Sequence, residues 1–178
     1  IMASELHVDA IKHSGGTSAL TIDSSGNLTA SAKLHSAGHV IQLVSNEYTS
    51  TTTLSSSTYV DSGLTCQITP KFSTSKIFIL VSQQLRMRHS SADSGGGWKI
   101  FRDSTEAKAS ATIYALYTYE ESSGGIDWRG WQNWNYLDSP STTSQITYKT
   151  QFGKYGGGVF ELQNAQNPST LTLMEIAQ

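Results

Sequence analysis

The run of residues 76–88 constrains the fold more than any other segment. It opens with the consecutive apolar residues Ile-Phe-Ile-Leu-Val and ends in polar alternation. On a helix, Ile77, Phe78 and Ile79 would surround the axis and leave no polar side. A strand that is covered on both faces accommodates such a run. We therefore predict a central strand, with Phe78 and Leu80 on one buried face and Ile77 and Ile79 on the other.

Two later segments show the period-two alternation of strands. A turn over residues 138–141 precedes apolar or aromatic residues at 146, 148 and 152, with polar residues between them. Residues 170–176 follow a second proline and place Leu171 and Leu173 on one face. Successive side chains of a strand point to opposite faces of its sheet. Both segments are therefore predicted to be strands, and the segment that closes this sequence is expected inside a sheet.

The composition favours sheets over helices. Only 37% of the residues are hydrophobic and 15% are charged, and Ser, Thr, Gly, Asn and Gln are frequent among the rest. These residues suit turns and the solvent sides of antiparallel sheets. Residues 107–119 contain alanines that suit a helix, but their Thr, Ile and Tyr residues favour a strand. Residues 90–97 are rich in Ser, Asp and Gly and are predicted to form a loop. The predicted strands number about eight, as in a jelly roll. The predicted fold is all-β, an antiparallel β-sandwich of the jelly-roll type.

Charge and cysteine content exclude several classes of protein. The net charge of -2 and the pI near 6.2 lack the basic excess of a nucleic-acid binder. No window approaches the ~20 apolar residues of a membrane span, and no secretion signal is recognisable. We therefore expect a soluble protein without membrane insertion. The single cysteine, Cys66, permits no intrachain disulfide, and its parity with Leu64 and Ile68 predicts that it is buried.

The composition changes once along the chain. Residues 2–38 contain no Trp, Tyr, Phe or Pro. Their few apolar residues alternate as two short strands, Leu6 with Val8 and Leu20 with Ile22. This is too little for an independent core, so three copies around an axis would have to bury these side chains together. We predict an N-terminal attachment arm or stem over residues 1–38 and a head domain over residues 39–178. The alternative is a disordered arm. The candidate attachment residues are Leu6, Val8 and Ile11.

Residues 126–136 are the strongest candidate for a ligand site. Three of the four tryptophans lie here, at 128, 131 and 134, among amide and charged residues. Flat rings beside planar polar groups are suited to sugar recognition, because a ring covers the apolar face of a pyranose. The candidate ligand-binding residues are Asp127, Trp128, Arg129 and Trp131. Trp134 and Tyr136 are assigned to the core or a subunit interface. Trp128 and Trp131 differ in parity, so one of them is expected to face outward.

Signatures of catalysis are missing. The chain has no phosphate-binding glycine loop, no Gly-x-Ser-x-Gly elbow and no His-Glu-x-x-His motif. Glu120 and Glu121 would point to opposite faces of a strand, so a glycosidase using them with Asp127 is disfavoured. The five histidines would suit an axial metal only as a ring in a trimer, and solvated or hydrogen-bonded histidines are favoured. We predict no catalytic residue, no metal and no cofactor.

Several segments resemble one family of virion proteins. These segments are residues 4–11, 17–26, 63–78, 136–151 and 167–176. They are similar to small fibre proteins of marine phages and cyanophages, whose C-terminal head is a trimeric jelly roll like that of tumour necrosis factor. The resemblance implies a homotrimer in the virion, an arm that binds other virion structural proteins, and a head that binds a host-surface glycan or other receptor. One alternative is a capsid decoration protein or head fibre with a structural role only. A second is a tail-spike depolymerase.

Overall fold

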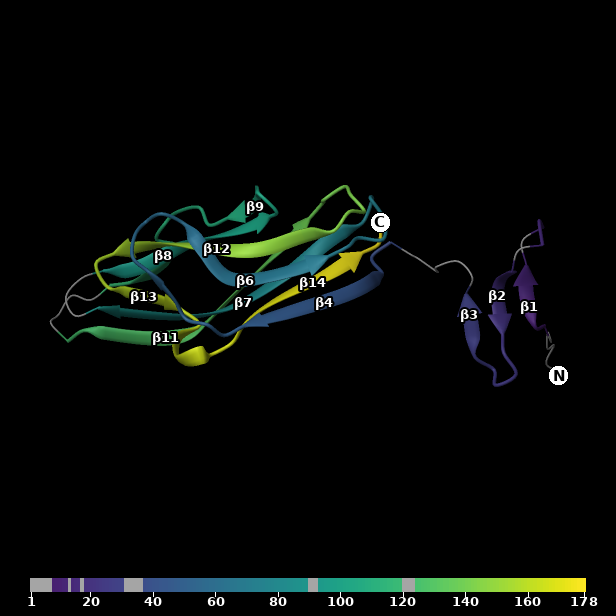
Figure 1. Ribbon diagram of the computed structural model, residues 1–178, viewed down its shortest axis with the longest axis horizontal. Helices are drawn as coiled ribbons and strands as arrows, with labels where there is room; N and C mark the ends of the chain where they lie inside the picture. Colours follow the sequence, from purple (N-terminus) through teal and green to yellow (C-terminus); the bar gives the residue numbers. More distant parts are fainter. Residues whose placement is uncertain (1–7, 13, 17, 31–36, 90–92, 120–123) are drawn as a thin grey trace, which may run out of the picture. The chain divides into compact units, whose positions relative to one another are not determined.

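The computed structural model describes the chain except for residues 1–7, 13, 17, 31–36, 90–92 and 120–123 (Figure 1). The chain divides into two compact units, residues 1–36 and 37–178. The described residues form fourteen β-strands and one short 3-10 helix, η1 (Asn164–Gln166), and no α-helix. The predicted all-β class is therefore confirmed, and the helix alternative for residues 107–119 is wrong.

The N-terminal unit is a three-stranded antiparallel sheet. Its strands are β1 (Ala10–Lys12), β2 (Ser18–Ile22) and β3 (Leu28–Ala30), in that order across the sheet. The Asp23 carboxylate accepts hydrogen bonds from the backbone N–H groups of Ser25 and Asn27, both at 2.9 Å, and closes the turn between β2 and β3. The first strand differs from the prediction. Val8 lies outside β1, which begins at Ala10 and pairs Ile11 with Leu20. Leu6 lies outside the described residues.

The C-terminal unit contains two sheets packed face to face. The larger one, called the β7 sheet below, is antiparallel throughout, with β7 near its middle. One edge of β7 pairs with β11, and the other is shared between β14 and β13, which pair in turn with β4 and β5. Its strands are β4 (Val40–Tyr48), β5 (Thr52–Leu54), β7 (Lys76–His89), β11 (Ile126–Asp138), β13 (Val159–Leu162) and β14 (Ser169–Ile176).

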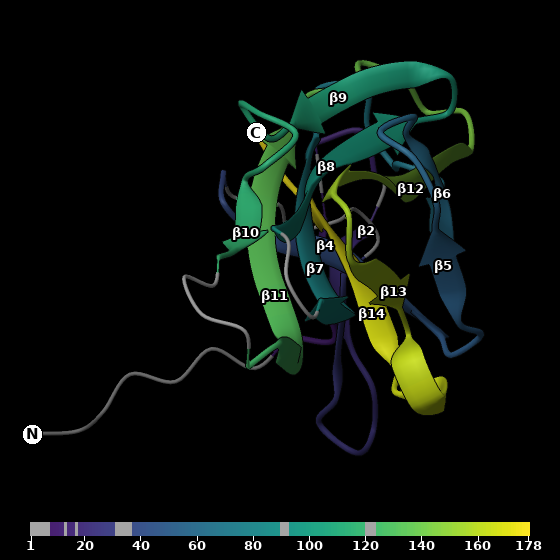
Figure 2. The same ribbon diagram turned by 90° about the vertical axis from the view of Figure 1, so that its left-hand side faces the viewer.

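The second sheet, called the β8 sheet below, covers one face of the β7 sheet (Figure 2). Its central pair is β8 with β12; β6 lies beyond β12, and β9 and β10 share the far edge of β8. Its strands are β6 (Val60–Ile68), β8 (Ser94–Arg102), β9 (Thr105–Ala109), β10 (Leu116–Thr118) and β12 (Ile146–Gly156). Two antiparallel sheets packed in this way form a β-sandwich, so the predicted sandwich is confirmed.

The core lies between the sheets as two apolar clusters. One contains Leu64, Cys66, Ile79, Ile100, Tyr148, Leu171 and Leu173, and the other contains Leu54, Leu85, Met87, Phe152, Phe160 and Leu162. Trp98 of the β8 sheet stacks on Trp134 of the β7 sheet, with ring centroids 4.8 Å apart, and both rings contact both clusters. The predicted core positions of Trp134 and Cys66 are thus confirmed. Burial also raises the pKa of the Cys66 thiol.

The prediction that β7 is buried on both faces is wrong for the single chain. Ile77 and Ile79 are fully buried against the β8 sheet. Phe78 and Leu80 point the other way and are partly exposed on the outer face of the β7 sheet. Only one of the two faces is covered by another layer among the described residues of this unit. The continuous apolar run therefore leaves apolar side chains at the surface.

The predicted loop over residues 90–97 is also corrected. Strand β8 begins at Ser94, so Gly95, Gly96 and Gly97 lie in the sheet and are buried. A Cβ atom at Gly95 would overlap the Leu116 carbonyl oxygen, and one at Gly96 would lie 2.6 Å from the Gly153 carbonyl oxygen. The glycines are therefore strand residues at which other segments approach the backbone closely.

Candidate functional site

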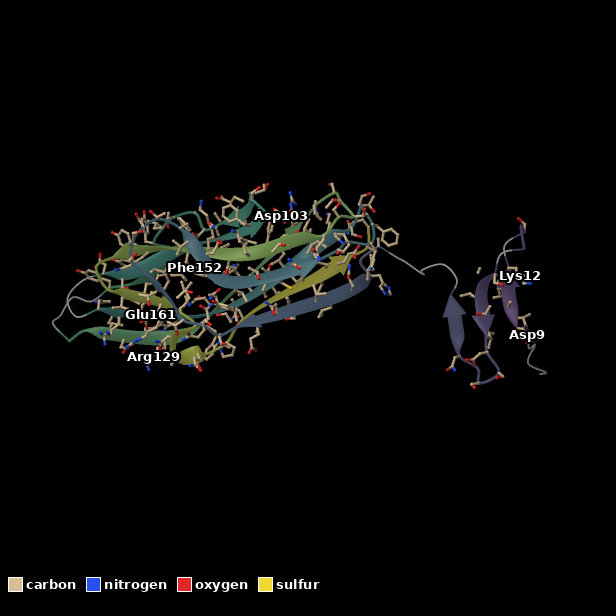
Figure 3. All side chains as sticks on the ribbon, in the orientation of Figure 1. Asp9, Lys12, Asp103, Arg129, Phe152 and Glu161 are labelled. Atoms are coloured by element: carbon tan, nitrogen blue, oxygen red, sulfur yellow. The ribbon has the colours of Figure 1, made fainter. Side chains whose placement is uncertain are left out.

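Strand β11 carries the predicted ligand-binding residues on both of its faces. Every second residue of the strand points to the outer face of the β7 sheet, and these include Asp127, Arg129 and Trp131. Trp131 is 49% exposed. The Trp131 indole donates a 2.9 Å hydrogen bond from Nε1 to the Pro168 carbonyl oxygen, which fixes the ring across the strands. The outer face of β11 therefore presents a carboxylate, a guanidinium and an indole in one line. Figure 3 places Arg129 toward the end of the sandwich away from the C-terminus.

Trp128 does not share this surface. It lies on the opposite face of β11 and packs against the cluster of Leu54, Leu85 and Phe160. The parity argument is correct in that one of the two rings faces outward, and that ring is Trp131. Gly130 accommodates the inward ring, because a Cβ atom there would lie 2.7 Å from Trp128 Cζ2. Trp128 is thus placed for packing between the sheets rather than for contact with a ligand.

Asp127 is held by a bidentate ion pair. Arg86 donates to its two carboxylate oxygens from Nε and Nη2, each at 2.8 Å, and from Nη1 to Glu161 at 3.2 Å. The hydrogen bond from Arg86 lowers the pKa of the Asp127 carboxyl, although partial burial opposes it. Arg129 approaches the same carboxylate at 3.5 Å and remains more than half exposed. Asp127 is therefore a fixed anion, and Arg129 is the more accessible charge.

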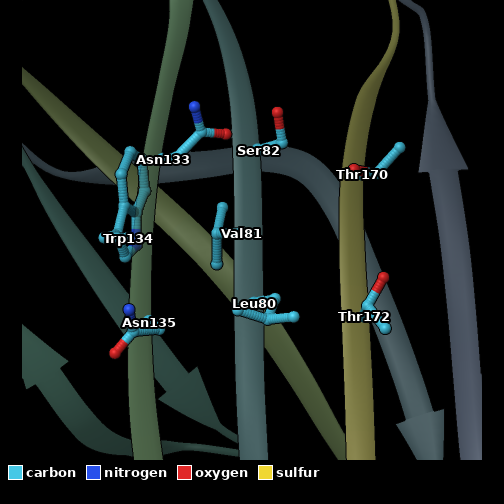
Figure 4. Close-up of a pocket in the computed structure, with 8 residues that line it drawn as sticks. All are labelled: Leu80, Val81, Ser82, Asn133, Trp134, Asn135, Thr170 and Thr172. Atoms are coloured by element: carbon cyan, nitrogen blue, oxygen red, sulfur yellow. The ribbon is translucent and has the colours of Figure 1, made fainter.

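A depression lies beside this line of residues on the outer face (Figure 4). It has a volume of about 370 Å³ and crosses strands β11, β7 and β14. Polar and apolar residues line it together: Leu80, Val81, Ser82, Asn133, Trp134, Asn135, Thr170 and Thr172. Their amides and hydroxyls offer donors and acceptors, but no charged group lines the depression. This surface suits an uncharged contact of mixed polar and apolar character.

A second aromatic surface was not identified as a site from the sequence. Tyr114, Tyr117, Tyr119 and Tyr155 lie close together, with exposed fractions of 53%, 46%, 58% and 37%. Tyr155 belongs to β12, whereas the others lie in or beside β10. The pairing of Tyr155 with Gly95, and of Gly95 with Tyr117, brings them together. The sequence signal is the concentration of aromatic residues from 114 to 136, which suggests a ligand site but does not show that the tyrosines around β10 lie beside Tyr155.

The remaining candidates are only partly described. Glu120 and Glu121 lie outside the described residues. In the N-terminal unit, Ile11 is 50% exposed and Val8 is half-buried. No group of three His, Cys, Asp or Glu side chains suited to a metal occurs in the part of the chain that the structure describes. Over the same residues, no helix is long and apolar enough to cross a membrane.

No protein-family model matches the chain, and no curated protein is similar to it.

Proposed function

We propose that the chain is a virion structural protein, a homotrimeric fibre or adhesin whose head binds a host-surface glycan or another receptor. The observation that carries this proposal is that exposed aliphatic side chains and exposed aromatic rings lie toward different ends of the sandwich. Exposed Val40, Leu43 and Leu137 lie toward the end of the unit that holds residue 37 and the C-terminus, whereas exposed Tyr114, Tyr117, Tyr119 and Tyr155 lie toward the other end. A fibre head needs one end for assembly and attachment and another for binding.

The apolar end is built by strand register. Leu43, Met174, Phe78 and Leu137 lie side by side across β4, β14, β7 and β11 on the outer face, and we call them the apolar row. Leu43 is 57% exposed and Leu137 is 45% exposed. Ile176 and Val40 extend this apolar surface as far as Lys76, which pairs with Ile176, and Val40 is 45% exposed. An apolar surface that spans a whole sheet is typical of a protein–protein interface.

The charge pattern suits association of identical copies. The row beside the apolar row consists of Ser45, Thr172, Leu80 and Asn135, so neither row carries a charge. Around a threefold axis, equivalent residues of the three copies come close together, and like charges there would repel. Uncharged rows avoid this repulsion. We therefore assign this part of the β7 sheet to the trimer interface.

The strand order supports a jelly-roll topology within the sandwich. One sheet has the order β4–β14–β7–β11, and the other has β6–β12–β8 followed by β9 and β10. Neighbouring strands in each sheet come from distant parts of the chain, and the first and last long strands of the unit, β4 and β14, pair with each other. A double Greek key brings the ends of its chain together in this way. We propose that the head is a jelly roll.

The interface is tested by replacing Leu43 with Glu. The trimer is expected to dissociate, because three carboxylates would be buried near one another. Val60→Glu is the matched control, since Val60 is 41% exposed in β6 of the other sheet. Light scattering should give a trimer for the wild type and for Val60→Glu but a monomer for Leu43→Glu. A trimer in all three proteins would show that the β7 sheet does not form the trimer interface.

The location and role are tested on particles. Antibodies raised against the sandwich should label a fixed position on the virus particle in electron micrographs, and the purified protein should bind host cells. Labelling without cell binding would favour the decoration protein or head fibre with a structural role only. Cleavage of host polysaccharide by the purified protein would favour the tail-spike depolymerase. Failure to label particles would contradict the virion assignment.

A further inference from the structure

The four exposed tyrosines form one connected group of rings. The ring centroids of Tyr114 and Tyr155 are 5.4 Å apart, those of Tyr155 and Tyr117 are 6.0 Å apart, and those of Tyr117 and Tyr119 are 6.5 Å apart. Isolated exposed apolar side chains are common on protein surfaces, but a contiguous exposed group marks an interaction site. The group lies at the end of the sandwich where β8 begins, away from the apolar row.

The sheet beneath the rings has almost no side chains. Gly97 and Gly153 face the segment before β10, and a Cβ atom at either would lie within 2.8 Å of Thr112 O or Ile113 Cδ1. The backbone N–H of Ser110 also donates to the Trp98 carbonyl oxygen at 2.9 Å. The segment that carries Tyr114 therefore lies directly on the β8 sheet. Close packing of this kind holds rings in place before a ligand arrives, which lowers the entropy cost of binding.

The rings enclose a concave site. Tyr114, Tyr117 and Tyr155 line a cavity of about 300 Å³ that is open to solvent. This is the lower limit of the range for small-molecule sites, and it suits one or two sugar rings rather than a folded domain. The Tyr117 hydroxyl is placed beside Asp93. Partial burial and a hydrogen bond to the Asp93 carboxylate raise the pKa of Tyr117, so its hydroxyl remains a neutral hydrogen-bonding group at physiological pH.

We infer that Tyr114, Tyr117 and Tyr155 form a carbohydrate-binding site that takes a pyranose ring of a surface glycan. The aromatic faces would cover the apolar C–H face of the sugar, and the phenol hydroxyls and the Asp93 carboxylate would meet its hydroxyl groups. The site differs from the line of Asp127, Arg129 and Trp131, which lies on the other sheet. This inference rests on the proposed receptor-binding function and specifies its ligand class and its residues.

The test is a glycan array probed with the labelled full chain, followed by titration with the glycan that gives the strongest signal. Tyr117→Ala and Tyr155→Ala should each weaken binding at least about tenfold. Tyr117→Phe and Tyr155→Phe keep the rings and should retain much more affinity. Phe72→Ala is the control, because Phe72 is 38% exposed and lies outside the site. Thermal melting and light scattering of every variant exclude loss of folding or assembly.

The possible results distinguish an error in this site from an error in the proposed function. If Trp131→Ala abolishes glycan binding and the tyrosine variants do not, the adhesin role stands and the site is wrong. If the array is blank while the protein still binds host cells, the ligand class is wrong. If tyrosine variants dissociate the trimer, the rings belong to a subunit interface and the inference is overturned. Absence of both cell binding and glycan binding contradicts the proposed function itself.

Discussion

Gln83 and Thr150 connect the two sheets through the middle of the sandwich. Thr150 Oγ1 donates a 3.2 Å hydrogen bond to Gln83 Oε1, and the Gln83 amide donates a 2.9 Å bond to Ser169 Oγ. Thr150 also shares a 2.6 Å hydrogen bond with Ser62. All four residues are buried, and Gln83 in β7 and Thr150 in β12 lie between the two apolar clusters along their strands. This polar layer fixes the register in which the sheets face each other.

Replacement of Gln83 by Leu should destabilise the fold although Leu is apolar and of similar size. Thr150 and Ser169 would each lose a hydrogen-bond partner in the core, and the free energy of unfolding should fall by about 1–3 kcal/mol. Gln67→Leu at an exposed site of β6 should change it by less than about 0.5 kcal/mol. Urea unfolding of both variants measures the difference. Equal midpoints would show that the polar layer contributes no stability.

Glu175 should make stability depend on acidity. Burial would raise the pKa of its carboxyl, but hydrogen bonds from Gln42 and from the backbone N–H groups of Lys71 and Phe72 outweigh burial and hold the pKa below its ordinary value of 4.5. A carboxyl with a lowered pKa in the folded state stabilises the fold above its unfolded pKa, and this contribution is lost as the pH falls through the folded value. The stability difference between the wild type and Glu175→Gln should therefore shrink on acidification below pH 4.5. Urea midpoints across a pH series measure it, and a constant difference would refute this account of Glu175.

Trp128 and Trp131 of β11 should contribute differently to stability. Trp128→Ala should cost at least about 2 kcal/mol, because the inward ring packs in the core. Trp131→Ala should cost less than about 1 kcal/mol, because its ring is half exposed. Thermal melting of the two variants compares them directly. A larger loss for Trp131 would mean that the faces of β11 are assigned incorrectly.

Gly95→Ala should loosen β10 without unfolding the sandwich. The added methyl group would overlap the Leu116 carbonyl oxygen, and the edge strand can move away more easily than the sheet beneath it. Hydrogen exchange should become faster at the amides of β10, while those of β14 keep their protection. Glycan binding should weaken with β10, since Tyr117 lies in that strand. Unchanged exchange at β10 would show that the strand tolerates a side chain at residue 95.

The sequence pattern predicted the sandwich because burial follows period two in its longest strands. Leu171 and Leu173, for example, are both fully buried, as their alternation indicated. The same logic failed for Phe78, because a continuous apolar run does not show whether the chain itself or another copy covers the second face. It also failed for Gly95. A glycine-rich sequence predicts a loop, and only the fold shows that another segment approaches the backbone there and leaves no room for a side chain.

Site residues could be predicted from the sequence only where they all lie on one strand. Asp127, Arg129 and Trp131 share parity, so one strand assignment places them on one face. The tyrosine site needs the pairing of β8 with both β10 and β12, which joins Tyr117 to Tyr155 across the sheet. Such long-range pairing leaves no local pattern in the sequence.

The central claim is that this chain assembles as a trimer through the outer face of the β7 sheet. Sedimentation equilibrium of the full chain at micromolar concentration tests it most directly. The account predicts a single species of about three times the chain mass of 19.3 kDa, with no dissociation to the monomer on tenfold dilution. A species of 19.3 kDa with an intact sandwich, judged by its cooperative thermal transition, would contradict the claim.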